Sequence, residues 1–189
     1  FPDFYCTNYS HEETGTGGLS IMDYGGYLFD TYCPLGYDAY ERNYVGWLSL
    51  TELTDAGTYS LYPFGSESEG ATAYIIRNDA NSKEYFILEN RQPTDYTPKA
   101  FGTGLFVVHV DYDATQWSQN VLNNDKNHLR MTYIPADNGK EYDYYSSMAE
   151  FKGSFYPYTY TVKDAGGNSG KMCNDSLTQN SVPNDAVFK

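Results

Sequence analysis

From about residue 50 onward, apolar and polar residues alternate in short segments separated by polar turns. A period of two is typical of β-strands, because successive side chains point to opposite faces of a sheet. Residues 78–82 have the Asn- and Asp-rich composition of a hairpin turn. Strands joined by short turns predict an antiparallel sheet or sandwich. The predicted strands are residues 58–62, 73–77, 84–90, 104–111 and 129–134, of which 104–111 is apolar enough to be buried on both faces.

Residues 34–47 have a different period, with aromatic residues three and four positions apart, which predicts a helix. Pro34 suits its first turn and Gly46 its end. The aromatic face consists of Tyr37, Tyr40, Tyr44 and Trp47.

Residues 1–33 lack helical periodicity and predict irregular loops, and the polar tail from residue 138 predicts little regular structure. The expected fold class is α+β, mainly β. We expect a first unit at residues 1–49 and a β-rich module at residues 50–189.

Composition narrows the class of protein. The chain has 12 Lys and Arg against 25 Asp and Glu, a formal charge of −13, which disfavours nucleic acid and anionic membrane surfaces as partners. No apolar run approaches the roughly 20 residues of a membrane span. No signal peptide is visible. Cys6 and Cys33 could form a disulfide or remain free thiols, and the sequence leaves both open.

Two stretches near the N-terminus point to metal chemistry. Residues 20–24, Ser-Ile-Met-Asp-Tyr, resemble the Met-turn of the metzincin metallopeptidases. The opening Phe-Pro-Asp-Phe-Tyr resembles the G-[LF]-P-D-x-Y segment of a metzincin-like group, the M6 (immune-inhibitor-A-like) metallopeptidases. This resemblance implies that Asp3 is the third zinc ligand, that Met22 forms the floor of the site and that Tyr24 stabilises the oxyanion or the activated water.

The same family resemblance continues through most of residues 1–140. The family carries Gly-Trp-Leu at a helix end, E-N-R-Q, G-x-G-L-x-x-x-H-V-D, an Asn, a His, and A-D. The matching positions are 46–48, 89–92, 102–111, Asn123, His128 and 136–137.

The resemblance implies part of a secreted or cell-surface bacterial zinc metalloendopeptidase acting on peptide or protein substrates. The H-E-x-x-H helix is absent: His11-Glu12 begins like it, but Gly15 stands where the second histidine should be. We therefore expect the chain to begin just after that motif, to be inactive by itself, and to need an upstream segment that completes the site. The alternative, from another class, is a non-catalytic β-sandwich module that binds a glycan or a protein, with the first 50 residues as a loose arm.

Polar residues within the predicted strands form a second candidate site. We expect mainly a buried hydrogen-bonded network, with Arg91 paired to a carboxylate and His109 donating to Asp111. A second metal site at His109, Asp111 and His128 is the other interpretation. Calcium is a further candidate, because Asp111, Asp113 and residues 123–125 supply hard oxygen ligands. The network consists of Glu89, Arg91, His109, Asp111 and His128.

Tyrosines in the tail also allow an aromatic binding surface for a glycan or a protein, although alternate-residue packing in strands is the favoured explanation. They are Tyr142, Tyr144, Tyr145, Tyr156, Tyr158 and Tyr160.

Overall fold

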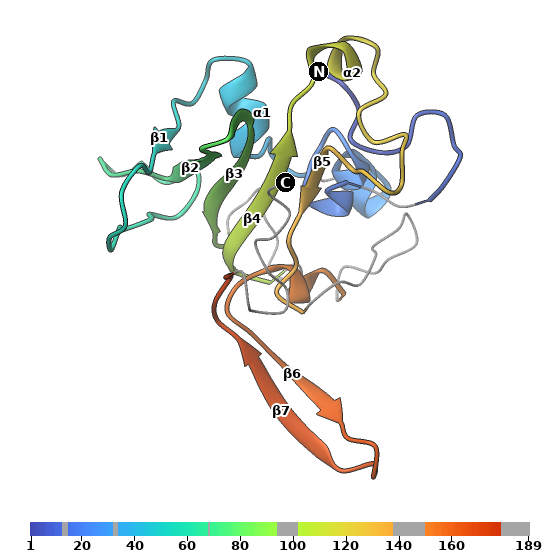
Figure 1. The fold of residues 1–189 in the computed structure, drawn as a ribbon, viewed down its shortest axis with the longest axis vertical. Coiled ribbons are helices and arrows are strands. Elements are labelled where there is room, and N and C mark those ends of the chain that lie inside the picture. The colour runs from blue at the N-terminus through green and yellow to red at the C-terminus, as the bar shows by residue number, and fades with distance from the viewer. Residues whose placement is uncertain (13–14, 32–33, 68, 94–101, 138–149, 179–189) are drawn as a thin grey trace.

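The structure is a computed structural model that describes residues 1–12, 15–31, 34–67, 69–93, 102–137 and 150–178 (Figure 1). The main sheet has five strands in chain order: β1 (Thr51–Glu52), β2 (Ala73–Asn78), β3 (Asn81–Arg91), β4 (Gly104–Asp111) and β5 (Met131–Tyr133). Strands β6 (Tyr158–Lys163) and β7 (Ser169–Asn174) form a separate hairpin. The helices are α1 (Ala39–Tyr44), α2 (Ala114–Ser118) and the 3-10 segments η1 (Gly17–Leu19), η2 (Tyr24–Thr31) and η4 (Glu150–Ser154). The chain is thus mainly β with short helices, as the sequence predicts.

Four of the five predicted strands are confirmed as β2, β3, β4 and β5, which pair antiparallel, while β1 runs parallel to β2. The predicted strand at 58–62 is wrong. This segment is mostly exposed, so the alternation of its residues does not correspond to a buried and an exposed face. It ends at Pro63, which has no N–H to donate and forms only an isolated bridge with Asn90. Strands β1 to β5 lie in a single sheet, and the described residues contain no second sheet packed face to face against it as a sandwich would require.

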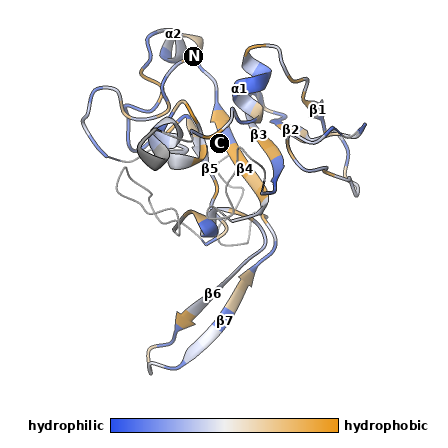
Figure 2. Cartoon of the chain, turned by 180° about the vertical axis from the view of Figure 1, so that it is seen from behind, coloured by the Kyte–Doolittle hydropathy of each residue, from blue (hydrophilic) through white to orange (hydrophobic). Residues whose placement is uncertain are grey.

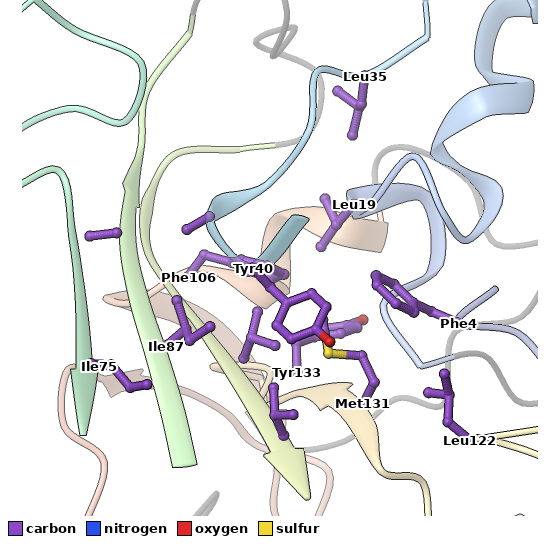
Figure 3. Packing of buried hydrophobic residues seen from close by; sticks show 14 of the residues in the cluster. Phe4, Leu19, Leu35, Tyr40, Ile75, Ile87, Phe106, Leu122, Met131 and Tyr133 are labelled. Atoms are coloured by element: carbon purple, nitrogen blue, oxygen red, sulfur yellow. The ribbon is translucent and has the colours of Figure 1, made fainter. Parts of the chain in front are cut away.

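The two faces of the sheet pack against different partners, as the period of two requires. One face carries Ile87 and Val108 and is covered by the N-terminal part of the chain through Phe4 and Leu19 (Figure 3). The opposite face carries Phe86 and Val107, in a smaller apolar cluster that includes Ile134 and Tyr156. Figure 2 shows the hydrophobic residues concentrated along the central strands β3 and β4.

The larger core crosses the predicted boundary at residues 49 and 50. Phe4, Leu35 and Tyr40 from the first unit lie in one buried cluster with Ile75 and Phe106 from the sheet. The division into units stays a prediction. The first 47 residues, where described, are nevertheless a packed layer on the sheet and not the loose arm that the binding-module alternative assumed.

Helix α1 starts later than predicted. Asp38 caps it: its side chain accepts a hydrogen bond from Glu41 N at 2.7 Å, and Glu41 bonds back to Asp38 N. This reciprocal capping box competes with Pro34 as the start signal and decides the boundary. Gly46, with φ +79°, follows the helix end as predicted. Of the four aromatic residues expected on one face, Tyr40 is buried, whereas Tyr44 and Trp47 are exposed.

The hairpin of β6 and β7 was not predicted and extends away from the main sheet (Figure 1). Its base is attached through reciprocal hydrogen bonds between Leu105 and Tyr156, at 2.8 and 2.9 Å. Its turn is organised by Asp164, which accepts from Gly166 N and Asn168 N, with Gly167 at φ +82°. No helix in the described part of the chain is long and apolar enough to cross a membrane.

Candidate functional site

The two N-terminal stretches that carry the family resemblance lie side by side. Phe4 N donates to Met22 O at 2.9 Å. The rings of Tyr5 and Tyr24 stack with their centroids 5.7 Å apart and an angle of 18° between their planes. Residues separated by about twenty positions in the sequence are therefore joined by both a main-chain bond and a ring contact.

Asp3 is held in place by Asn120, which no sequence motif indicates, and by Tyr5 of the opening segment. Its Oδ2 accepts from Asn120 Nδ2 at 2.7 Å, and its N donates to Asn120 Oδ1 at 2.6 Å. The Tyr5 side chain also hydrogen-bonds Asp3, and burial together with the Asp3 charge raises the pKa of Tyr5 to about 12. Asn120 has φ +57°, a conformation that Asn adopts more readily than most residues. In the sequence, the tendency of Asn to adopt this positive φ is the one feature that could have drawn attention to Asn120.

The loop after α2 continues this clamp on the N-terminal segment. Asn123 is fully buried and donates to Phe4 O and Met131 O at 2.6 and 2.7 Å. Asn124 Oδ1 accepts from Thr7 N at 2.7 Å. Asn123 and Asn124, two of the candidate calcium ligands, thus join the N-terminal segment to the sheet.

The inside of the Met-turn-like segment is built around Asp23. Its Oδ2 accepts from Thr16 N and Gly17 N, both at 2.8 Å. Burial raises the pKa of Asp23 to about 7, against the effect of these hydrogen bonds. Gly25 comes so close to Ser20 that an added Cβ would lie 2.3 Å from its carbonyl oxygen. A side chain at position 25 would therefore open the turn.

Glu41 of α1 fastens the same turn to the helix. Its Oε1 accepts from Ser20 Oγ at 2.6 Å and from Met22 N at 3.0 Å, and its Oε2 accepts from Asp38 N at 2.6 Å. Glu41 is fully buried. Sequence reasoning missed it, because an acidic residue in the first turn of a helix is ordinarily explained by capping alone.

Glu89 and Arg91 extend this network into the sheet, and the prediction that Arg91 pairs with a carboxylate is confirmed. Arg91 forms a buried ion pair with Glu89, whose other oxygen accepts from Ala39 N at 2.9 Å. The Arg91 guanidinium lies 5.1 Å from the centre of the Phe106 ring. Burial, with the charges of Glu41 and Glu89, raises the pKa of Asp38 well above its usual range.

The remaining members of the predicted network lie on the opposite face of the sheet. His109 Nε2 lies 3.0 Å from Glu84 Oε1, a residue not included in the prediction. Asp111 Oδ2 lies 2.7 Å from His128 Nε2 and 2.8 Å from Arg130 Nη1. The single network expected from the sequence is therefore two clusters, separated by the sheet.

The second cluster borders a pocket of about 330 Å³. The pocket lies between the start of β3, the end of β4 and the loop before β5. Its polar lining includes Glu84, His109, Asp111, His128, Lys126 and Thr132.

The oxygen ligands considered for calcium serve local structure instead of converging. Asp113 caps α2 by accepting from Thr115 N and Gln116 N, and Asp125 accepts from Asn127 N. In the described residues, no three His, Cys, Asp or Glu side chains are already arranged around one point to hold an ion. Calcium stays an untested prediction.

Of the tyrosines considered for an aromatic surface, the three that the structure describes do not form a single exposed face. Tyr142, Tyr144 and Tyr145 lie outside the described residues. Tyr156 is buried, and Tyr158 and Tyr160 stack on each other along β6.

Cys6 is a buried free thiol whose Sγ donates to Asn8 Oδ1 at 3.0 Å, so it does not form the disulfide considered above. Cys33 lies outside the described residues. No family model, curated protein or solved structure matches this chain.

Proposed function

We propose that this chain is part of a secreted, zinc-dependent metalloendopeptidase that hydrolyses peptide bonds, with Asp3 as a zinc ligand. The observation that carries the proposal is the contact between the segment of Asp3 and the Met-turn-like segment, through Phe4 with Met22 and Tyr5 with Tyr24. A metzincin-like site needs its third ligand directly beside its Met-turn, and these two stretches meet although the chain between them is irregular.

The donor set of this chain fits zinc in part. Carboxylate oxygen is a normal zinc ligand, and Asn120 and Tyr5 hold the Asp3 carboxylate in one orientation, as supporting hydrogen bonds do around metal ligands. A catalytic zinc site requires three protein ligands. Asp3 alone cannot hold the ion tightly, so the proposal requires two histidines and a general base from an upstream H-E-x-x-H segment of a longer protein.

When bound, zinc would lower the pKa of a water molecule to about 7 and so make it a nucleophile at neutral pH. The residues of this chain would position the site. Tyr24 stacks on Tyr5, and its hydroxyl would stabilise negative charge on the substrate carbonyl oxygen. Met22 packs against the main core, and its N is bound by Glu41, so that the floor of the site would be rigid.

The test compares this chain with a protein extended upstream by several tens of residues of its natural sequence. Zinc content per chain and cleavage of casein are measured for both, and for Asp3→Ala in the extended protein. Asp55→Ala, which removes an exposed carboxylate, is the matched control. We expect one zinc per extended chain, casein cleavage, loss of both with Asp3→Ala, and no change with Asp55→Ala.

The proposal fails if the extended protein neither binds zinc nor cleaves peptides. That outcome would favour the alternative drawn from the sequence, a non-catalytic module that binds a glycan or a protein. Equal zinc content in Asp3→Ala and the unaltered extended protein would remove Asp3 from the ligand set.

A further inference from the structure

The pocket at the ends of β3 and β4 is a second place where metal-ligating side chains come together. It lies on the face of the sheet opposite to Met22, because His109 and Asp111 point away from the core that contains Val108 and Val110. It shares no side chain with the site proposed around Asp3.

Strand register brings three of its side chains together. Glu84 on β3 is directly opposite Asp111 on β4, and His109 follows on the same face two positions away. Side chains directly opposite each other in an antiparallel pair have Cβ atoms about 5 Å apart, and diagonal neighbours about 7–8 Å. These distances allow side chains of this length to meet at one point.

His128 adds a fourth group from the loop before β5. Its Nε2 is 2.7 Å from Asp111 Oδ2, and its side chain is 38% exposed, so it lies at the mouth of the pocket. The pocket therefore contains two imidazole–carboxylate pairs, one buried and one at its opening.

We propose that this pocket binds one divalent transition-metal ion, with His109 and His128 as nitrogen ligands and Glu84 and Asp111 as oxygen ligands. In the structure these groups form two pairs and not a finished cage. Binding would exchange the two histidine–carboxylate contacts for metal–ligand bonds by rotation of side chains on β3, β4 and the loop before β5. It would also compete with the hydrogen bonds from Arg130 to Asp111 and from Asn78 to Glu84.

The mixture of ligands determines the class of ion. Two imidazoles and two carboxylates suit Zn²⁺, Mn²⁺, Fe²⁺ or Co²⁺, whereas Ca²⁺ and Mg²⁺ prefer oxygen alone. The site shares Asp111 with the calcium candidate considered from the sequence but none of its other ligands, and it adds Glu84 to the metal site considered there at His109, Asp111 and His128.

Charge and burial favour an ion at this position. The Glu84 and His109 side chains are each only 7% exposed, and the Glu84 oxygens contact His109 Nε2 at 3.0 Å and accept from Asn78 Nδ2 at 2.9 Å, so a cation would balance the buried carboxylate charge that these neutral groups leave. Lys126 and Arg130 oppose a cation, and Arg130 already pairs with Asp111. We therefore expect binding in the micromolar range and not the tight binding of a structural zinc site.

The test is titration of the chain, after removal of metal with EDTA, with ZnCl₂ and with CoCl₂. Calorimetry gives the stoichiometry and dissociation constant, and the visible spectrum of Co²⁺ reports on its ligands. We expect one ion per chain in the unaltered protein. In His128→Ala the dissociation constant should be at least about tenfold higher, because loss of even a supporting residue lowers the affinity of metal sites by about that factor. His128 is partly exposed, so this variant is expected to fold; Glu84→Gln, which preserves shape, provides a second variant.

Two matched controls separate this site from others. His11→Ala removes the third histidine of the chain, and Asp3→Ala removes the ligand proposed for the peptidase site; both should leave this binding unchanged. The proposal is overturned if no ion binds at millimolar concentration. It is also overturned if His128→Ala and Glu84→Gln bind as tightly as the unaltered chain, or if His11→Ala weakens binding as much as His128→Ala does.

Discussion

Asp23 is buried almost completely, although a carboxylate is costly to remove from water. Two main-chain N–H groups, from Thr16 and Gly17, bond to its Oδ2, but burial still outweighs them and raises its pKa to about 7. In the unfolded chain its pKa returns to about 3.9. Between these two values the folded state holds a proton that the unfolded state has released.

The first prediction follows from this difference. Since the folded state binds more protons in that range, the contribution of Asp23 to the unfolding free energy falls as pH rises from about 4 to about 7, and then levels off. Asp23→Asn keeps the shape and removes this titration. Urea unfolding at several pH values should therefore show a smaller loss of stability over that range in Asp23→Asn than in the unaltered chain.

Each variant must be compared with the unaltered chain, because the pKa values of Asp38 and Glu41 are also raised. These two residues therefore also make the unfolding free energy fall as pH rises. Asp55→Asn, at an exposed position, is the control and should keep the full pH dependence. If Asp23→Asn lost stability with pH as steeply as the unaltered chain, Asp23 would not be protonated in the folded state near neutral pH.

At the scale of elements, helix α1 stabilises the Met-turn-like segment mainly through the Glu41 side chain. The helix has six residues, too short to be stable by itself. Glu41 nevertheless accepts from Ser20, Met22 and Asp38, and Asp38 closes the capping box. Helix and turn are therefore one hydrogen-bonded unit.

The second prediction concerns this unit. Glu41→Ala leaves two buried donors, Ser20 Oγ and Asp38 N, without this acceptor, each worth roughly 1–3 kcal/mol, and Met22 N keeps only its longer bond to Ser20 Oγ; we expect a loss of about 2 kcal/mol or more in unfolding free energy. Glu69→Ala, at an exposed position, should change stability by less than about 0.5 kcal/mol. Urea unfolding measures both. Similar stability of the two variants would show that the turn does not depend on Glu41.

The elements that sequence patterns predicted well are those with one strong local signal. Strand β3 follows a turn rich in Asn and Asp, β4 is a continuous apolar run, and Gly46 marks the end of α1. The start of α1 was missed because Pro34 and Asp38 both resemble start signals and only the capping contact to Glu41 separates them. The hairpin of β6 and β7 was missed because it alternates in a polar tail with little burial.

The sequence indicated which polar residues belong to candidate sites, but not which of them lie together in space. A period of two places Glu89 and Arg91 on one face and His109 and Asp111 on the other once strand register is known, but one sequence does not give that register. Asn120 was out of reach for a similar reason: its partner Asp3 is 117 positions away.

At the scale of the whole molecule, the described part of the chain is joined by one main core. Trp117 Nε1 donates to Tyr40 OH at 2.5 Å, which links the helix after β4 to the helix before the sheet. Phe4 and Leu19 pack in the same cluster as Met131 from β5. Residues on both sides of the predicted boundary therefore contribute to this core.

The third prediction is that the chain unfolds in a single transition. Fluorescence of buried Trp117, measured in Trp47→Phe to remove the exposed tryptophan, should change at the same urea concentration as far-UV circular dichroism. A protein of residues 50–189 alone should lack a sharp transition. Two separate transitions in the full chain, or cooperative unfolding of the shorter protein, would instead support two independent units.

The hairpin of β6 and β7 has a consequence for how copies of this protein behave together. In the described residues these strands pair only with each other, so each presents an outer row of N–H and C=O groups to its surroundings. Such edges are templates for strands of other molecules, and natural proteins protect them with charge. Lys163 and Lys171 are exposed on the two strands, and we expect their charges to oppose edge-to-edge aggregation at high protein concentration.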